Sequence, residues 1–564
     1  MAPAFHQVYD PVAGSVALSA LVAALPLVVL ALALAVVRAA PWKAAVAGAL
    51  TAGALAWLVW GMPLGLAASA FTHGMAFGLW PISWVVVSAV FFYNLTVASS
   101  DFDVIRRSLA RLAADRRVQA LLVAFGFGAL VEGLAGFGAP VAISAAMLAG
   151  LGFEPVTAAV LALVANTAPV AFGSIGIPVT TLGGLVAPIL GRDAASVTRE
   201  LSAVVGRQLP FFSVLIPAYL VVLLAGWRRM LEVLPAVLAA GVSFALVQLL
   251  VANLVGPELT DILAALACLG ALALLLRFWQ PREVYLGATA TTPEPPASPD
   301  SPGRVARAYA IYALLVLVVL GGQLAAPWLR KVSYEAAWPG SFAVVEGHVT
   351  PLVVREPPVV AQPSPYPLRY RVELLSASGT LVFAAALAAF LPMLAFGLPA
   401  RSFPATFART LRQLGLPIAT IAFILSIATV MNYSGMTSSL ALALAATGVL
   451  FPFFSAFIGM LGVFVTGSDT ASNSLFGPLQ ATTARISGID PLLAAATNSS
   501  GGVMGKMISP QNLSVGAAGV GAVGREGEIL RRVLGHSLAL TSLMGLLAML
   551  QAYVFPGMIA VHTR

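Results

Sequence analysis

The stretch Asn166-Thr-Ala-Pro-Val-Ala-Phe-Gly-Ser-Ile-Gly-Ile-Pro178 places polar, glycine and proline residues inside a strongly apolar region of the chain. Glycine and proline weaken helical hydrogen bonding, so this stretch predicts a helix that is interrupted near its middle. In a membrane, exposed backbone is tolerated only where protein buries it or water reaches it. The stretch therefore indicates an interior cavity beside Asn166 and Thr167. Close helix packing on small residues would explain the glycines, but not these two polar side chains.

The composition around this stretch is that of a membrane protein. Of the 564 residues, 60% are hydrophobic and 9% are charged, whereas about a quarter of the residues are charged in an ordinary soluble domain. Apolar runs of about 20 residues, enough to cross roughly 30 Å of hydrocarbon as a helix, recur along the chain. The runs that predict spans are 13–37, 43–61, 80–98, 209–226, 232–255, 259–278, 305–326, 376–398, 412–431 and 537–556. With the Gly-rich stretches between them, they predict an all-α polytopic membrane protein of roughly 12–14 transmembrane segments.

The basic residues lie in short loops between the apolar runs, and the formal net charge is +8. They form no stripe with interleaved aromatic residues, so a nucleic-acid partner is not expected. By the positive-inside rule, loops such as 106–117 and 228–229 lie in the cytoplasm, which places the N-terminus outside. Residues 1–12 contain no Lys or Arg, so the first span is expected to be retained and not cleaved as a signal.

Two polar stretches divide the chain. Residues 281–304 are rich in proline and too poor in apolar residues to pack, so they predict a cytoplasmic linker between two transmembrane halves, 1–280 and 305–564. Residues 327–374 mix short β-favouring runs such as Phe342-Ala-Val-Val345 with several prolines. With the linker inside and the span 305–326 crossing outward, this stretch is expected to lie outside. We expect an ordered extracytoplasmic loop and not a catalytic domain, because the stretch contains no paired catalytic groups.

The interrupted helix has a second copy in the C-terminal half. Glu154-Pro155 matches Asp490-Pro491, and Asn166, Gly173 and Pro178 match Asn498, Gly505 and Pro510 with the same spacing of seven and twelve residues from the asparagine. Transporters are often built from two such repeats. The motif regions 120–190 and 460–515 therefore predict two inverted repeats, each with a re-entrant hairpin and an interrupted helix.

Polar side chains at these interruptions suit a small organic anion. Broken helices offer partly positive N–H groups to a carboxylate, and amide or hydroxyl side chains add directional hydrogen bonds. The predicted substrate-binding residues are Asn166, Thr167, Ser468, Asn498, Ser499, Ser500 and Lys506.

Three ionisable residues, Glu132, Asp469 and Lys506, are expected at membrane depth, where an unpaired charge costs roughly 2.5–3.5 kcal/mol. Lys506 is one of only three lysines among 30 basic residues. It can bind a carboxylate, or pair with Asp469 or Glu132. Glu132 and Asp469 are predicted to bind a coupling proton, because a carboxyl group removed from water favours its neutral form. A fixed ion pair, a helix cap and a snorkelling lysine stay open as alternatives.

Motifs for catalysis or cofactor binding are not found. Residues 500–507 resemble a phosphate-binding loop only superficially, since Ser500 and Met507 replace the required Gly and Ser/Thr, and no strand precedes them. His-Glu-x-x-His is absent, and the five histidines are scattered. We therefore expect a protein that is not an enzyme and that holds no cofactor or metal.

The motif sequences are similar to those of the bacterial L-lactate permease family. The similar strings are Glu132-Gly-Leu-Ala-Gly-Phe-Gly-Ala-Pro-Val-Ala-Ile-Ser144, Ala165-Asn-Thr-Ala-Pro-Val-Ala-Phe-Gly-Ser-Ile-Gly-Ile-Pro178, Thr466-Gly-Ser-Asp-Thr-Ala-Ser-Asn-Ser-Leu-Phe476 and Gly505-Lys-Met-Ile-Ser-Pro-Gln511. The resemblance covers almost the whole chain apart from the linker, and strings of this length are specific.

This resemblance implies symport of a proton with lactate, and often glycolate, across the cell inner membrane. The motif residues that it carries over are Glu132, Asn166, Thr167, Ser468, Asp469, Asn498, Ser499 and Lys506. The partners are then a small monocarboxylate, a proton and the lipid bilayer, and the sequence does not indicate an oligomeric state. A passive organic-anion channel and a sodium-coupled carboxylate transporter remain alternatives. Only the second motif carries a lysine, so we expect the C-terminal repeat to hold the charge of the anion.

Overall fold

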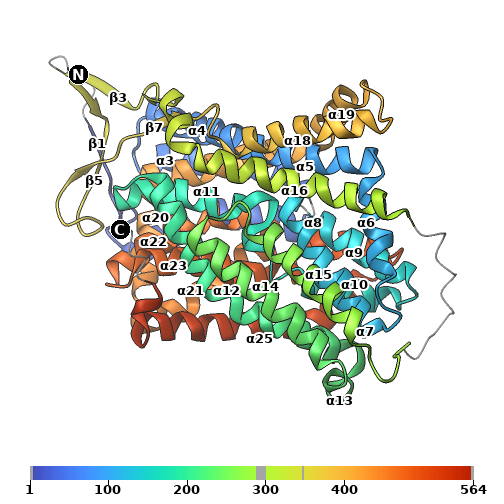
Figure 1. Ribbon diagram of the computed structural model, residues 1–564. Helices are drawn as coiled ribbons and strands as arrows, with labels where there is room; N and C mark the ends of the chain where they lie inside the picture. Colours follow the sequence, from blue (N-terminus) through green and yellow to red (C-terminus); the bar gives the residue numbers. More distant parts are fainter. Residues whose placement is uncertain (1–3, 38, 137, 287–299, 346–347, 560–564) are drawn as a thin grey trace.

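The computed structural model describes residues 4–37, 39–136, 138–286, 300–345 and 348–559 (Figure 1). Within these ranges, 12 helical stretches are long and apolar enough to cross a membrane. The chain is therefore a mostly helical, multi-pass membrane protein, as its apolar runs predict.

The N-terminal half contains fifteen of the described α-helices. They are α1 (Val16–Ala23), α2 (Leu25–Ala35), α3 (Pro41–Leu58), α4 (Leu64–Phe77), α5 (Trp84–Ala98), α6 (Asp101–Ala110), α7 (Arg116–Ala120), α8 (Gly128–Leu134), α9 (Ala139–Gly150), α10 (Pro155–Ala165), α11 (Gly173–Leu190), α12 (Ala194–Ala225), α13 (Trp227–Leu231), α14 (Leu234–Leu254) and α15 (Thr260–Phe278). The π-helical turns η1 (Gly78–Ser83) and η2 (Leu121–Phe127) join α4 to α5 and α7 to α8.

The C-terminal half contains the other ten. They are α16 (Pro302–Leu324), α17 (Ala326–Leu329), α18 (Ser378–Ala395), α19 (Ser402–Ser434), α20 (Met436–Ala445), α21 (Phe451–Thr466), α22 (Asp469–Ile486), α23 (Pro491–Gly505), α24 (Pro510–Gly519) and α25 (Glu526–Tyr553). Of the predicted linker 281–304, residues 287–299 lie outside the described ranges. Its predicted end is slightly late, because α16 already begins at Pro302.

Three long helices extend well beyond the predicted apolar spans. α12 has 32 residues where the sequence predicts 209–226, and α19 has 33 where it predicts 412–431. α25 begins at Glu526 instead of near 537. Charged residues such as Arg199 and Arg409 lower the apolar signal of the outer turns, although the backbone continues as helix there. α4 was missed entirely, and it continues through η1 and α5 as one stretch of 35 residues.

The prediction of an all-α protein is wrong for residues 334–372 and for the N-terminal segment. β2 (Tyr334–Ala337) pairs with β7 (Arg369–Val372), β3 (Phe342–Val345) pairs with β4 (His348–Pro351), and β5 (Val353–Arg355) lies between β1 (Phe5–His6) and β6 (Ser364–Pro365). These segments are too short and too polar to form spans, so their backbone groups pair as strands instead. The predicted β-favouring run at Phe342 is confirmed, and the N-terminal strand lies with the loop 327–374.

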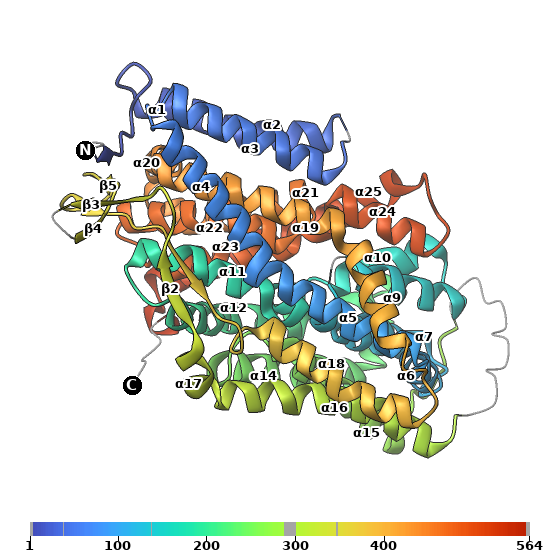
Figure 2. The same ribbon diagram turned by 90° about the horizontal axis from the view of Figure 1, so that it is seen from above.

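The strands gather at one end of the helical body, which we call the strand end (Figure 1). The opposite end carries α6, α7 and α13, and we call it the arginine end. Its ion pairs include Arg107–Asp300, Arg117–Asp115 and Arg307–Asp101. Seen from above, α1, α2 and α3 form a layer along one edge, and α15, α16 and α18 lie along the opposite edge (Figure 2). The motif helices lie between these two edges.

The two interrupted helices begin in the same way. The carboxylate of Glu154 accepts hydrogen bonds from the backbone N–H groups of the second and third residues after it, and Asp490 does the same. In each case a proline occupies the first helical position, where its missing N–H is not needed. The matched acidic-Pro pairs are therefore helix starts.

The first interruption is wide and strained. α10 stops at Ala165, and a 3₁₀ turn, η3 (Val170–Phe172), follows. Ser174, Ile175 and Gly176 then have left-handed φ angles of +46°, +61° and +71°. A β-branched residue such as Ile175 rarely adopts this conformation, so the surrounding structure must hold it in place.

The second interruption is narrower, and it changes which residues of the two motifs correspond. α23 runs about two turns past Asn498 before the 3₁₀ turn η6 (Lys506–Ile508) breaks it. Pro178 and Pro510 both stand where a second helical arm begins, so the prolines correspond. The asparagines do not, because Asn166 caps the end of α10 whereas Asn498 lies inside α23. Lys506 takes the capping position in the second copy.

Candidate functional site

The interruptions and the hairpin tips beside them meet inside the protein. A Cβ atom added to Gly136, at the tip between α8 and α9, would lie 2.1 Å from Oγ of Ser174 in the first interruption. One added to Gly467, at the tip between α21 and α22, would lie 2.5 Å from a side chain of α24. Nδ2 of Asn473 in α22 donates to the carbonyl of Pro178 at 3.1 Å. These four segments therefore form one buried region, which we call the central site.

An ion pair joins the two halves of the chain in the central site. Nζ of Lys506 donates to both carboxylate oxygens of Glu132 at 2.8 Å, and Nδ2 of Asn166 donates to Glu132 Oε2 at 2.8 Å. Glu132 and Lys506 are only 2% and 5% exposed. The attraction within a buried ion pair offsets the free energy of its desolvation only when hydrogen bonds satisfy the remaining polar atoms of the pair. Three predicted residues from three segments thus come together, and the pairing of Lys506 is with Glu132.

Gly173 permits this close approach. A Cβ atom at this position would lie 2.5 Å from Oε1 of Glu132, nearer than real Cβ atoms come to other heavy atoms. The glycine at the start of α11 therefore leaves room for the carboxylate. This contact gives a specific reason for one of the glycines in the motif.

Asp469 lies in a second polar cluster, built from α22 and α23. Oγ of Ser499 donates to its Oδ2 at 2.6 Å, and Nδ2 of Asn473 lies 3.3 Å from the same oxygen. Its other oxygen is buried and has no hydrogen-bond partner among the described residues. Asp469 is close enough to Lys506 and Glu132 for their charges to interact. The cluster is therefore part of the same electrostatic environment as the ion pair.

Asn498 is held rigidly in this cluster. Its Nδ2 donates to Oδ1 of Asn473 at 2.8 Å, and its Oδ1 accepts from Nε2 of Gln480 at 2.8 Å. All three side chains are fully buried. Both polar atoms of the Asn498 amide are thus hydrogen-bonded, so Asn498 holds the cluster in position in this conformation.

The other predicted residues are engaged locally or lack partners. Thr167 Oγ1 donates to the carbonyl of Val164 in the last turn of α10, and Ser468 caps α22 by accepting the N–H of Ala471. Oγ of Ser500 is buried without a hydrogen-bond partner in the described part of the chain. Thr167 and Ser468 therefore have structural bonds in this conformation, whereas Ser500 has a free hydroxyl.

Asp261 is the most important residue that the sequence analysis missed. It is 1% exposed, and neither of its carboxylate oxygens has a hydrogen-bond partner among the described residues. A Cβ atom on Gly133, the neighbour of Glu132, would lie 3.0 Å from its Cβ. Asp261 stands in the first turn of a long apolar span, where an acidic residue is common because of the helix dipole. The sequence therefore carries no signal that this carboxyl is buried, whereas Asn473 and Gln480 lie in or near a motif already quoted.

A large cavity opens at the strand end and reaches toward the central site. Its volume is about 760 Å³, and its lining includes Thr180 of α11, Pro257 and Glu258 before α15, and Arg371 of β7. Pro257 packs closely against Gly176: a Cβ atom added to Gly176 would lie 2.6 Å from the carbonyl carbon of Pro257. The floor of this strand-end cavity thus lies directly against the first interruption.

Two solved transporter structures are similar to this fold at low sequence identity. The YdaH transporter of Alcanivorax borkumensis is 14% identical, with a TM-score of 0.43 over 85% of this chain and 86% of that chain. MtrF of Neisseria gonorrhoeae, described as one of a class of antimetabolite efflux pumps, is 15% identical, with a TM-score of 0.43 over 86% and 83%. Likeness at this level assigns no function to the chain.

Sequence relatives are far closer. Residues 19–555 match the family model described as L-lactate permease. Glycolate permease GlcA of Escherichia coli (strain K12) is 44% identical over 98% of this chain and 99% of that protein. The L-lactate permeases of Bacillus subtilis (strain 168) and Escherichia coli (strain K12) are 41% and 42% identical over the same shares of each chain. The chain therefore belongs to the L-lactate permease family, a family of transporters and not of enzymes.

Proposed function

We propose that the chain carries lactate and related 2-hydroxymonocarboxylates such as glycolate across the bacterial inner membrane together with protons. The observation that carries this proposal is the buried Lys506–Glu132 pair at the meeting point of the interrupted helices. A cation is available there for a carboxylate, and an acid is available for a proton. The names of the relatives, lactate and glycolate permeases, support the substrate class.

The arrangement of the motif helices supports two inverted repeats. α10 begins at the arginine end, where Glu154 lies 3.8 Å from Arg532. α23 begins near the opposite end of α11, because Arg485, shortly before α23, donates to the carbonyl of Ile189 at 2.9 Å. The two interrupted helices therefore run in opposite directions, and their hairpins α8–α9 and α21–α22 enter from opposite faces. We place the arginine end in the cytoplasm and the strand end with the N-terminus outside, by the positive-inside rule.

The ion pair offers a simple coupling device. While Glu132 is ionised it occupies Lys506, and a substrate carboxylate cannot take the same ammonium group. A proton on Glu132 removes this competitor, so Lys506 becomes free to bind the anion. Substrate and proton then favour each other's binding, which is the thermodynamic requirement for symport.

The 2-hydroxyl group of the substrate can be recognised by groups beside the pair. Oδ1 of Asn166 is buried without a partner among the described residues, while its Nδ2 already donates to Glu132. An unpartnered amide oxygen accepts a hydrogen bond from a hydroxyl group. Ser500 Oγ is also unpartnered, and Ser499 and Thr167 can re-orient their hydroxyls. Asn166 is thus our first choice for selecting a 2-hydroxy acid over the acid without the hydroxyl group.

Asp261 supports a route for the coupling proton. A buried carboxylate without any donor would be very costly, so Asp261 is expected to carry a proton in this conformation. Glu258, three residues earlier, lines the strand-end cavity, and Glu132 lies on the other side through its neighbour Gly133. Asp261 thus stands between a cavity and the ion pair, and we assign it the transfer of protons to Glu132. Asp469, with one free oxygen, is the second proton-binding candidate near Lys506.

The test is uptake of labelled lactate by proteoliposomes that contain the purified protein. We expect accumulation above equilibrium when the interior is more alkaline, and no effect when choline replaces sodium. Flux that is independent of the gradient and never accumulates would identify a passive channel. Accumulation that follows a sodium gradient, with no response to pH, would identify a sodium-coupled transporter and remove protons from the proposal.

A further inference from the structure

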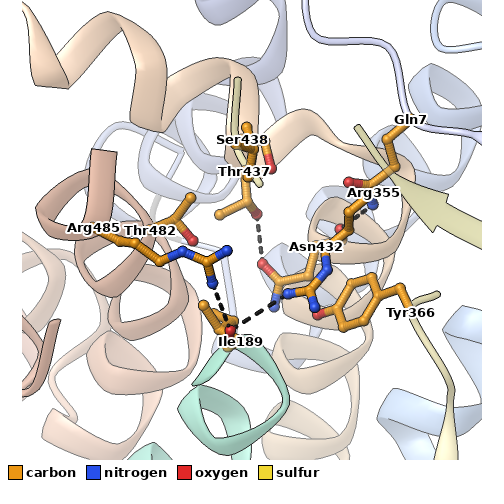
Figure 3. A pocket seen from close by; sticks show the side chains of 10 residues that line it. Gln7, Ile189, Arg355, Tyr366, Asn432, Thr437, Ser438, Thr482 and Arg485 are labelled. Carbon is orange, nitrogen blue, oxygen red and sulfur yellow. Dashed lines mark hydrogen bonds between the residues drawn. The ribbon is translucent and has the colours of Figure 1, made fainter. Parts of the chain in front are cut away.

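A second set of cationic groups lies away from the central site, in a small niche at the strand end (Figure 3). The niche has a volume of about 20 Å³. The side chains that can donate hydrogen bonds into it are Arg355 of β5, Asn432 of α19, Ser438 of α20, Thr482 and Arg485 of α22, and Tyr366. Among its described lining residues there is no carboxylate. The niche therefore presents donors and positive charge with no anion of its own.

The two arginines of the niche converge on a single weak acceptor. Arg485 donates to the backbone carbonyl of Ile189 at 2.9 Å, and Arg355 approaches the same oxygen at 3.5 Å from the other side (Figure 3). Nε of Arg355 is buried with no hydrogen-bond partner among the described residues. One carbonyl dipole cannot balance two guanidinium charges, so the repulsion between them is left uncompensated.

Three other arginines at this end of the molecule have acidic partners. Arg192 pairs with Glu200, Arg369 with Glu335, and Arg371 with Asp193. Arg355 and Arg485 form no ion pair with any carboxylate in the described ranges; Arg355 instead stacks over the ring of Tyr366 at 4.9 Å. Two arginines held together without an acid indicate a place that an external anion neutralises.

The size and position of the niche favour the head of a carboxylate. A volume of about 20 Å³ admits little more than one water-sized group. Tyr366 and Asn432 also line the strand-end cavity, so the niche opens toward a space of about 760 Å³. A carboxylate group can sit between the guanidinium groups while the rest of a small acid extends into this cavity. Arginine forks match a planar carboxylate with two parallel hydrogen bonds.

We propose that Arg355 and Arg485 form an outer binding site that takes the carboxylate of the transported monocarboxylate before it reaches Lys506. The identity of this ligand rests on the proposed function. The site joins the strands to the outer ends of α11 and α22, which are arms of the two motifs. It therefore raises the local concentration of anion at the entrance to the strand-end cavity.

The test is the concentration dependence of lactate uptake by cells that express the chain and lack other lactate carriers. Arg485→Gln and Arg355→Gln are each expected to raise KM about tenfold, the loss of one charged hydrogen bond, with the maximal rate little changed. Lys331→Gln, which changes an exposed cation of the same end that lines neither the niche nor the strand-end cavity, is the matched control and should leave KM unchanged. Arg485→Lys keeps the charge and should give an intermediate KM, and it carries the test if the glutamine variant does not fold.

Two results would overturn the outer site. One is an unchanged KM in folded Arg485→Gln and Arg355→Gln; the other is a loss of maximal rate alone. A chloride ion would suit the same chemistry, so uptake is also measured with methanesulfonate in place of external chloride. A chloride dependence that Arg485→Gln abolishes, with the lactate KM unchanged, would assign the niche to chloride and reject our proposal. Failure of the proposed function is distinct, because wild-type cells would then take up no labelled lactate.

Discussion

Glu132 is the residue on which the two halves of the chain converge. It comes from the first hairpin, it accepts a hydrogen bond from Asn166 in the first interruption, and it pairs with Lys506 in the second. All three residues can be identified from the sequence, because ionisable and amide side chains at membrane depth are costly and therefore conspicuous. The sequence left open whether Lys506 pairs with Glu132 or with Asp469, since pairing depends on contacts between segments that are hundreds of residues apart.

Glu132→Gln is expected to separate exchange from accumulation. Glutamine resembles the protonated acid, so Lys506 is free for the substrate at every pH, but no proton can be carried. Exchange of labelled for unlabelled lactate across proteoliposomes should persist, while accumulation driven by a pH gradient should fall to background. Lys506→Gln should lose both activities, because no cation remains for the carboxylate. Glu283→Gln, an exposed change at the arginine end, is the control and should retain both. Gradient-driven accumulation by Glu132→Gln would show that another residue carries the proton.

Asp261→Asn tests the proton route without changing the shape of the side chain. Asparagine cannot pass a proton on, so net uptake driven by a pH gradient should slow at least severalfold. Exchange at equal pH on both sides needs no net proton movement and should remain near the wild-type rate. Both rates are measured on the same proteoliposome preparation. If net uptake by Asp261→Asn equals that of the wild type, Asp261 has no part in coupling.

At the scale of the elements, the pattern of Gly, Pro and acidic-Pro pairs was sufficient to locate the interrupted helices. It matched the acidic-Pro pairs at which both helices begin, because proline positions follow from local backbone rules. It did not predict where α23 ends. Asn498 looks like the partner of Asn166 by spacing, but hydrogen bonds with Asn473 and Gln480 hold it inside a continuous helix. Tertiary contacts of this kind cannot be predicted from a local sequence pattern.

Gly173→Ala is expected to damage the first interruption. The added methyl group would lie 2.5 Å from a carboxylate oxygen that Lys506 holds in place, so something must shift. Overpacking of this kind costs about 1–3 kcal/mol. A lower melting temperature and a loss of lactate uptake are both expected. Gly53→Ala is the matched control, since nothing lies within 4 Å of its Cβ position, and it should gain about 0.5–1 kcal/mol as a better helix former. Normal lactate uptake by a folded Gly173→Ala variant would mean that transport continues when the carboxylate of Glu132 is displaced.

At the scale of the whole molecule, the strands tie the beginning of the chain to its second half. β1 pairs with β5, about 350 residues later, and β7 reaches α12 through the Arg371–Asp193 ion pair at 3.0 Å. The sequence predicted an ordered loop here and placed it on the same side as the N-terminus. It did not predict the pairing of strands. A two-residue strand such as β1 has no alternating pattern of its own and is recognised only by its hydrogen bonds to a partner strand.

The Asp193 link makes attachment of the strands sensitive to acid. Partial burial alone would raise the pKa of Asp193, but hydrogen bonds from the backbone of Ser196 and from Arg371 hold this pKa below its ordinary value of 3.8. Because the folded pKa is depressed, the stabilisation is complete above the ordinary value and is lost as pH falls through the lower one. The melting temperature of Asp193→Asn should therefore lie below that of the wild type at about pH 5 and approach it as pH falls well below 3.8. Asp10→Asn, an exposed change near the same end, should show no gap at either pH. A gap that persists undiminished in acid would contradict this account.

The Lys506–Glu132 pair also has an electrical consequence. The pair carries no net charge, and in the loaded state that we propose, Lys506 with a bound carboxylate beside a protonated Glu132 carries none either. A carrier whose core is equally neutral when empty and when loaded experiences no force from the membrane voltage, which acts at about 2.3 kcal/mol per charge per 100 mV. Each transport cycle should then produce no current. A cell that depends on this protein would draw on its pH gradient to take up the acid and leave its voltage untouched.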